Sequence, residues 1–450
     1  MEARIIRRSV VTIAVGLAMG SAGVAHATNG YFAHGYGTKA KGMGGVGMAI
    51  SQDAYAPGIN PAGIAGMETR FDGSITYFRP ERSFEAGMPS NPAAVQGGAP
   101  AVNPGSVDSN SENFFIPSIA FVQQIDESRS WGIAMLGNGG MNTDYPAYGR
   151  EQCEMMGQGD QGGAFCSGTA GVNLEQIAII PTYAQKFADG RVSVGFSPII
   201  SYQRFSAEGL DTFREASVDG DNLTSGRTDS TWGYGAQIGF QAELAEGARV
   251  GGSYRSKIRN GDFDDYSGLF ADGGSFDIPS TYGLGFSVDV TPSVTLSADY
   301  QKIRYSEIDA ISNPSANIMN APSPMNPNGD PEARFGGANG PGFGWDDVNV
   351  FKFGAQIDRG NGWIWRVGYN RGENPISSED VMLNMLAPAV MTDHYTFGFT
   401  REFGQHEINF AGMYAPTQRV RGQDVTGMAG QDIEIEMRQY ELEIGYAYRF

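Results

Sequence analysis

Residues 231–244 read TWGYGAQIGFQAEL, and every second position from Trp232 to Leu244 holds an apolar or aromatic residue. The positions between them hold Gly, Gln or Glu. Side chains of a β-strand point alternately to its two faces, so this spacing predicts a strand with one apolar face and one polar face.

The same alternation recurs along the chain, and the repeats are long. It is found at 191–205, 282–288, 294–300, 351–357, 363–369 and 395–399. A soluble β-sandwich also alternates, but its strands are usually about five to six residues long and its connections are short at both ends. No segment approaches the roughly 18 uninterrupted apolar residues of a membrane-spanning helix. The chain is therefore either a soluble β-protein or a membrane barrel.

The connections between the expected strands are unequal, which separates these two classes. Short turns are expected at 126–128, 188–190, 245–248, 291–293, 359–362 and 404–405. Long polar loops are expected at approximately 86–112, 143–172, 207–229, 267–275, 310–345, 377–388 and 422–431. Seven hairpins joined by six turns give 14 strands with both chain ends on the short-turn side, as in bacterial outer-membrane barrels. The sequence predicts an all-β fold: a 14-stranded antiparallel transmembrane barrel over residues 68–450.

Both ends of the chain support an exported barrel. Arg4, Arg7 and Arg8 precede an apolar run at 10–19, and Ala25-His26-Ala27 offers the small residues of a cleavage site, so residues 1–27 are expected to be a cleaved signal peptide. The apolar run is about half the length that a spanning helix needs. The last strand alternates up to a terminal Phe450 and resembles the C-terminal assembly signal of outer-membrane barrels. We therefore expect a multi-pass, monomeric protein of the bacterial outer membrane, inserted by the barrel assembly machinery and surrounded by outer-membrane lipid and lipopolysaccharide.

Composition narrows the possible partners. Of the 450 residues 64 are Gly, and Lys and Arg together number 31 against 50 Asp and Glu, which gives a formal net charge of −19. Such a charge disfavours nucleic acid as a partner. With four His and two Cys in the whole chain, no metal site is expected. Cys153 and Cys166 enclose part of the second long loop and are expected to form a disulfide in an oxidising compartment.

Residues 28–67 do not alternate, and they are rich in Gly, Ala and Met. A flexible segment of this kind, ahead of the first strand, is expected to fold into the barrel as a hatch or plug. It contains Gly42-Met43-Gly44-Gly45-Val46-Gly47, which matches the dinucleotide-binding pattern G-x-G-x-x-G. That pattern needs a preceding strand and a βαβ unit, and neither is expected here, so no cofactor is predicted.

Four stretches carry a family resemblance. These are NGYFAHGYGTKAKGMGG at 29–45, the box Asn60-Pro61-Ala62, SYRSKIR at 253–259 and DIPSTYGLGF at 277–286. Together they resemble the FadL family of outer-membrane long-chain fatty acid and hydrocarbon transporters. The resemblance implies a plugged barrel that admits hydrophobic small molecules and releases them sideways into the membrane through a kinked third strand.

The third expected strand contains Gly137, Asn138, Gly139 and Gly140, which interrupt its alternation. Glycines weaken a strand and allow bulges. The resemblance implies an inward kink that opens the wall; a simple bend into the next loop is the alternative. The box Asn60, Pro61 and Ala62 is expected to form a rigid turn between plug and barrel, and the resemblance adds a gating role that a purely structural turn would lack.

Two further groups of residues are candidates for ligand contacts. Arg255, Lys257 and Arg259 alternate with Tyr254, Ser256 and Ile258, so the three cations are expected to share a lumenal face. They could bind a fatty acid carboxylate or form salt bridges with lumenal acids such as Asp299 and Glu243. The apolar loop 381–388 could form part of an entry site or pack against other loops, and its candidate residues are Met382, Leu383, Met385 and Leu386.

Two other classes of function remain as alternatives. An outer-membrane hydrolase would need a nucleophile with its base, but the sequence has no Gly-x-Ser-x-Gly elbow, so no enzymatic activity is predicted. An open porin would have no plug. Passive uptake of long-chain fatty acids is the main expectation, with alkanes or aromatic hydrocarbons as the alternative substrates.

Overall fold

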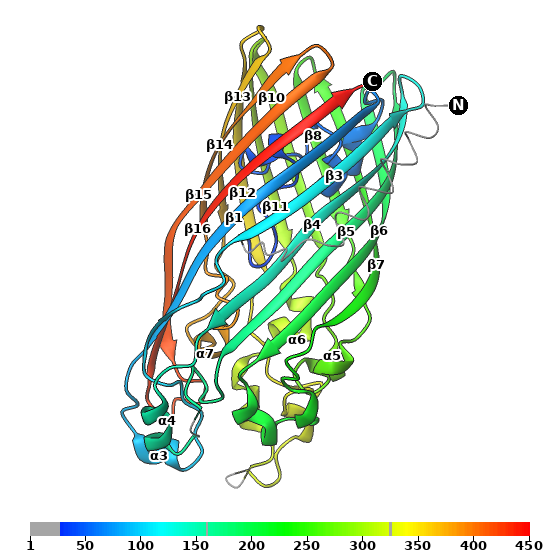
Figure 1. The fold of residues 1–450 in the computed structure, drawn as a ribbon. Helices are drawn as coiled ribbons and strands as arrows, with labels where there is room; N and C mark the ends of the chain where they lie inside the picture. The colour runs from blue at the N-terminus through cyan, green and yellow to red at the C-terminus, as the bar shows by residue number, and fades with distance from the viewer. Residues whose placement is uncertain (1–27, 159–160, 324–325) are drawn as a thin grey trace, which may run out of the picture.

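The computed structural model describes residues 28–450 except 159–160 and 324–325, so the expected signal peptide lies outside the described residues. The described chain forms one antiparallel sheet of fourteen long strands that closes on itself (Figure 1). The long strands are β1 Arg70–Ala86, β3 Phe114–Gln124, β4 Arg129–Tyr145, β5 Ala170–Phe187, β6 Val192–Glu208, β7 Asp229–Ala245, β8 Ala248–Arg255, β10 Thr281–Thr291, β11 Val294–Ile303, β12 Val348–Asp358, β13 Trp363–Gly372, β14 Asp393–Phe403, β15 His406–Gln423 and β16 Asp432–Arg449.

Each long strand pairs with its neighbours in the chain, and β16 pairs with β1 to close the barrel. The closing register runs from Arg70 opposite Arg449 to Ala86 opposite Ile433. Two short strands supplement the sheet: β2 Gly105–Asp108 pairs with β1, and β9 Arg259–Asn260 pairs with β7. The prediction of a 14-stranded antiparallel barrel is confirmed.

The polar and apolar faces point as a membrane barrel requires. In β7, the side chains of Trp232, Tyr234 and Ile238 are 48%, 67% and 52% exposed on the outer surface. Gln237 on the opposite face is buried and donates a hydrogen bond to the Ile59 carbonyl of the N-terminal segment, at 2.8 Å. The apolar face therefore contacts lipid, and the polar face lines the lumen.

Helices and turns occupy the loop end and the lumen. None of the helices in the described ranges is both long and apolar enough to cross a membrane. The α-helices are α2 Thr38–Lys41, α3 Pro92–Gln96, α4 Arg150–Met156, α5 Ala271–Gly274, α6 Asp309–Ser312 and α7 Val381–Asn384. The 3-10 helices are η1 Ala56–Gly58, η2 Pro61–Ile64, η3 Asp211–Ala216, η4 Gly220–Asn222, η5 Asp264–Tyr266, η6 Tyr305–Glu307, η7 Ser315–Asn320 and η8 Pro331–Ala333.

The two ends of the barrel differ. The helices α3, α4, α5 and α6 gather beyond one end of the strands, whereas the C-terminus lies at the opposite end (Figure 1). Residues 28–67, drawn in dark blue, lie inside the ring of strands. We call residues 28–67 the plug. Its helix α2 packs against β14, β15 and β16, and η2 packs against β5, β6 and β7, so the plug reaches across the lumen.

Candidate functional site

Glycines on the lumenal face of the barrel let the plug backbone approach the strands. A β-carbon at any of these positions would collide with plug atoms. Such glycines come from strands all around the barrel: Gly139, Gly195, Gly239, Gly251, Gly354 and Gly368. They make close approach possible because they present no side chain. Part of the high glycine content is thus explained by the fit between plug and wall.

The glycine pattern inside the plug has the same explanation. Gly44 and Gly45 adopt positive φ angles of 72° and 82°, which favour glycine. The Gly44 amide donates to the Thr396 hydroxyl at 2.8 Å, and the Gly47 amide donates to the Asp299 carboxylate at 2.7 Å. The amides that would face phosphates in a dinucleotide site therefore bind barrel side chains.

Buried charges dock α2 against the barrel wall. Lys41 Nζ lies 2.9 Å from Glu441 Oε1 and 2.8 Å from Glu443 Oε2, and Lys39 Nζ lies 2.7 Å from Glu407 Oε2. Burial alone would lower the pKa of Lys41, but the two carboxylates outweigh it and raise that pKa. The lysine therefore stays charged, and the ion pairs fix the plug in the lumen.

The box Asn60-Pro61-Ala62 joins the plug to β6 and β7. The Asn60 side chain caps η2 by accepting from the Ala62 amide at 3.1 Å. Its Nδ2 also donates to the carbonyls of Met48, at 2.7 Å, and of Phe240 in β7, at 2.9 Å. One side chain thus connects two turns of the plug with the wall.

The glycine cluster of β4 forms a bulge. Gly137 pairs with Ile177 of β5 and Gly139 with Gln176, so Asn138 is an extra residue without a pairing partner in β5. One extra residue reverses the direction of every side chain beyond it. Leu136 is buried on the lumenal side before the bulge, whereas Thr143 and Tyr145 are buried after it. The interrupted alternation seen in the sequence is therefore a register shift.

The pairing between β3 and β4 is interrupted beside this bulge. The β3–β4 pairing ends at Ile119 opposite Met135. Beyond it, the described residues 114–118 of β3 pair with β1 but not with β4, and β5 is the strand along which β4 continues. Toward the loops, the Asn110 amide donates to the Asp144 carbonyl and bounds the opening on that side. We call this interruption the β3–β4 opening.

The plug's first residues lie behind the bulge. Phe32 forms a β-bridge with Gly139, and the Gly140 amide donates to the Tyr31 carbonyl at 3.2 Å. The rings of Tyr31, Tyr305 and Trp345 pack together, with centroids 5.4 Å apart for Tyr31–Tyr305 and 5.1 Å for Tyr305–Trp345. An aromatic cluster from the plug and from the loop between β11 and β12 therefore lies close to the β3–β4 opening.

The three cations at 255–259 do not share one face, contrary to expectation. β8 ends at Arg255 opposite Gln237, and Arg259 next pairs with Tyr234. Four residues on one strand thus match three on the other, and this offset turns Arg259 to the exposed side. Lys257 is half-buried, and its Nζ lies 3.3 Å from Asp277 Oδ2. Its ion-pair partner is therefore Asp277 and not the expected Asp299 or Glu243.

Arg255 is buried, and each of its three guanidinium nitrogens has a protein partner. Its guanidinium donates to the Gln237 side chain, to the Asn138 side chain and to the Gly58 carbonyl, at 3.1, 3.1 and 2.7 Å. The Tyr36 hydroxyl also donates to the Asn138 carbonyl at 3.1 Å. The sequence singled out Arg255 and Asn138 separately, and the structure brings them together between plug and bulge.

The apolar segment after β13 is packed beneath the loops. Met382, Leu383, Met385 and Leu386 are all buried. The Trp345 indole donates to the Asn384 side chain at 2.6 Å, and the Tyr145 hydroxyl donates to the Met385 carbonyl at 3.0 Å. The segment therefore lies between the aromatic cluster and the loop end of β4.

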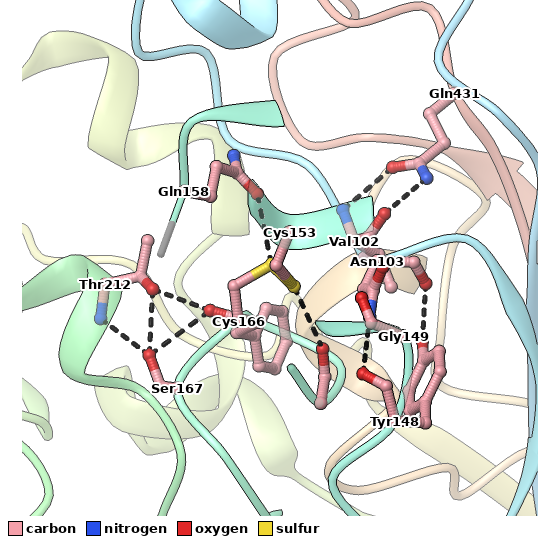
Figure 2. Close-up of a disulfide and its surroundings, with 12 residues drawn as sticks. Val102, Asn103, Tyr148, Gly149, Cys153, Gln158, Cys166, Ser167, Thr212 and Gln431 are labelled. Atoms are coloured by element: carbon pink, nitrogen blue, oxygen red, sulfur yellow. Dashed lines mark hydrogen bonds between the residues drawn. A yellow bond between two sulfur atoms is a disulfide. The ribbon is translucent and has the colours of Figure 1, made fainter. Parts of the chain in front are cut away.

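Cys153 and Cys166 form a disulfide in the loop between β4 and β5 (Figure 2). It belongs to a small buried cluster with Val95, Ala101, Met156 and Ala429, which come from three different loops. The Gln431 side chain adds bonds to the amide and carbonyl of Val102, at 2.8 and 2.6 Å. These contacts hold the long loops together over the barrel.

Several site residues had no clear signal in the sequence. Tyr305 and Trp345 lie in a long polar loop, and nothing local distinguishes them from other loop aromatics. The lumenal glycines looked like ordinary small residues on the polar face of each strand. Only the path of the plug, which is set by contacts far apart in sequence, reveals their role.

Comparison with known proteins identifies the family. Residues 24–450 match the family model described as outer membrane protein transport protein (OMPP1/FadL/TodX). The chain belongs to the OMPP1/FadL/TodX family. Members of this family are outer-membrane transporters of hydrophobic compounds, and the expected location in the outer membrane is confirmed. No curated protein matches the sequence.

Solved structures with the same fold are distant relatives in sequence. The P. putida toluene transporter TodX aligns with a TM-score of 0.64 at 16% identity, over 93% of this chain and 99% of its own. The Ralstonia pickettii toluene transporter TbuX gives 0.62 at 18%, over 93% and 99%. A Pseudomonas aeruginosa FadL homologue gives 0.64 at 14%, over 94% and 100%. At these identities the likeness to FadL and TodX structures shows the fold alone.

Proposed function

We propose that this OMPP1/FadL/TodX family member carries hydrophobic molecules passively from the loop end of the barrel into the membrane, without a chemical step. The ligand enters among the loops, contacts the aromatic cluster and the apolar segment 381–388, and leaves sideways through the β3–β4 opening. Rearrangement of residues 29–36 of the plug accompanies its exit. The observation that carries this proposal is the coincidence of the β4 bulge, the missing β3–β4 pairing and the bridge from Phe32 to Gly139.

Lateral release fits the chemistry of the wall. The lumenal plug is held by buried ion pairs, and a path straight through it would carry an apolar molecule past those charges. The opening, in contrast, leads toward the outer face, where apolar side chains such as Phe115 and Ile133 are exposed to lipid. An apolar ligand is more stable in that environment.

Long-chain fatty acids are the proposed substrate class, and neutral hydrocarbons are the second candidate. The second candidate is supported by Arg255, because each of its guanidinium nitrogens already donates to a protein group. Labelled oleate, a long alkane and toluene should be supplied to cells that lack their own channel for hydrophobic compounds, with and without this protein. Oleate uptake supports the first candidate, uptake of hydrocarbons alone supports the second, and uptake of none contradicts both.

The lateral route has its own test, a deletion of Asn138. Removing this extra residue straightens β4 and restores continuous pairing with β5, so we expect uptake to fall to the level of cells without the protein. Asn138→Ala keeps the bulge and loses only the side-chain bonds, and it should retain most of the uptake. A heat-dependent gel shift would show that both variants form barrels. Normal uptake by a folded deletion variant would contradict lateral release.

A further inference from the structure

Arg82 of β1 reaches across the loop end of the β3–β4 opening. Its side chain is buried on the lumenal side. The guanidinium donates through Nη1 to the Asn142 carbonyl of β4 and through Nη2 to the Ser111 carbonyl, just before β3. It also stands over the Phe114 ring, 5.7 Å from the centroid. Arg82 thus holds the two edges of the opening together.

This cation has no acidic partner. In the part of the chain that the structure describes, no carboxylate lies within ion-pair distance of Arg82, whereas Lys39, Lys41 and Arg70 each have one or more. Glu112, in the loop beside it, is paired with Arg79 at 3.1 Å. The Arg82 Nε is buried without a hydrogen-bond partner. Neutral carbonyls only partly replace the lost hydration of a buried charge.

The surroundings of Arg82 are suited to an amphiphile. The Phe84 and Tyr145 rings meet edge to face, with centroids 4.8 Å apart, and the Tyr145 hydroxyl binds the Met385 carbonyl. Apolar side chains therefore continue from the segment 381–388 through Tyr145 to Phe84 of β1, two residues from Arg82. The planar guanidinium is the side-chain group best matched to a carboxylate, which it binds with two parallel hydrogen bonds.

We propose that Arg82 is a carboxylate-binding site at the β3–β4 opening and receives the head group of a fatty acid as it leaves the barrel. The carboxylate supplies the missing counter-charge and replaces the Asn142 and Ser111 carbonyls as acceptor, which frees the edges of the opening. Arg82 then acts as a specificity-determining residue that favours acids over neutral molecules of the same shape. This inference rests on the proposed lateral route.

The test compares uptake of oleate with uptake of its methyl ester, which has the same chain and no charge. For the wild type we expect both to enter, with oleate faster. Arg82→Gln should slow oleate by about tenfold, equivalent to about 1.4 kcal/mol, and leave the ester unchanged or faster. Arg82→Lys keeps the charge and should retain a preference for oleate. Arg438→Gln, at an exposed ion pair with Glu81 on the neighbouring strand, is the matched control and should behave as wild type.

Equal losses of oleate and ester in Arg82→Gln would overturn the proposal, because a purely structural bridge would affect both. Entry of the ester without oleate in the wild type would also overturn it. If Arg82→Gln does not reach the membrane as a folded barrel, Arg82→Lys decides, since loss of its preference for oleate contradicts a charge-based site. Failure of the lateral route is recognised separately, by normal uptake of both compounds in the Asn138 deletion.

Discussion

Asn60 is a residue whose side chain links two turns of the plug to each other and to the barrel wall. Its side chain accepts a hydrogen bond from the Ala62 amide and donates to the carbonyls of Met48 and Phe240, all inside the lumen. Asn60→Ala removes three hydrogen bonds, each with a net contribution of roughly 0.5–1.5 kcal/mol, while the fourteen-strand wall keeps its own pairing. We expect uptake to fall at unchanged barrel yield, measured as transport per folded protein. A loss of yield with normal transport per barrel would show a purely structural turn.

At the same scale, residues differ in how far the sequence reveals them. The disulfide between Cys153 and Cys166 could be predicted, because the chain has two cysteines and each therefore has one possible partner. Asn138 could be suspected because the glycines around it visibly break the alternation. Arg259 could not be placed, because its direction depends on one residue of offset against β7, and pairing offsets are not encoded locally. Arg82 had no signal at all, since its position at the opening follows from three strands meeting.

At the scale of elements, α2 depends on its buried ion pairs. Lys41→Met removes the cation that Glu441 and Glu443 both face, and removing one partner of a buried ion pair is strongly destabilising. We expect the plug to dock less stably by about 3–5 kcal/mol, seen as faster protease cleavage within residues 28–67 of the folded barrel. Arg421→Met is the control: it breaks an exposed ion pair with Asp432 outside the plug. It should change the free energy of plug docking by about 1 kcal/mol or less, so cleavage should stay close to that of the wild type. Equal cleavage of the two variants would contradict this role for Lys41.

The elements themselves were largely readable. The period of two is a local property, so the strands and the six short turns follow from the sequence. The short β2 and β9 were missed because they lie within long loops and exist only by pairing with β1 and β7. The helical turns of the plug were also missed, because their backbone geometry is set by contacts with the wall more than by local preference.

At the scale of the whole molecule, the fit between plug and wall decides whether the barrel is closed. Lumenal glycines on many strands accept the plug backbone, and buried ion pairs anchor it to β15 and β16. The sequence shows both partners, a glycine-rich segment and glycine-rich strand faces, but not their register, because the two are brought together only when the barrel closes. A barrel filled in this way differs from an open porin of the same strand number.

Ion conductance in a planar bilayer tests this closure directly. The wild type should show little steady conductance, because the plug occupies the lumen. Gly368→Ala places a β-carbon against the backbone of Met43 and Gly44, so the plug has to move away from β13 and conductance should rise. Gly412→Ala is the matched control: its β-carbon meets no atom closer than 3.6 Å, from the lipid-exposed Leu442, and its conductance should equal that of the wild type. A large steady conductance of the unmodified protein would mean that the plug does not seal the barrel, and the uptake route would then have to be sought through the lumen.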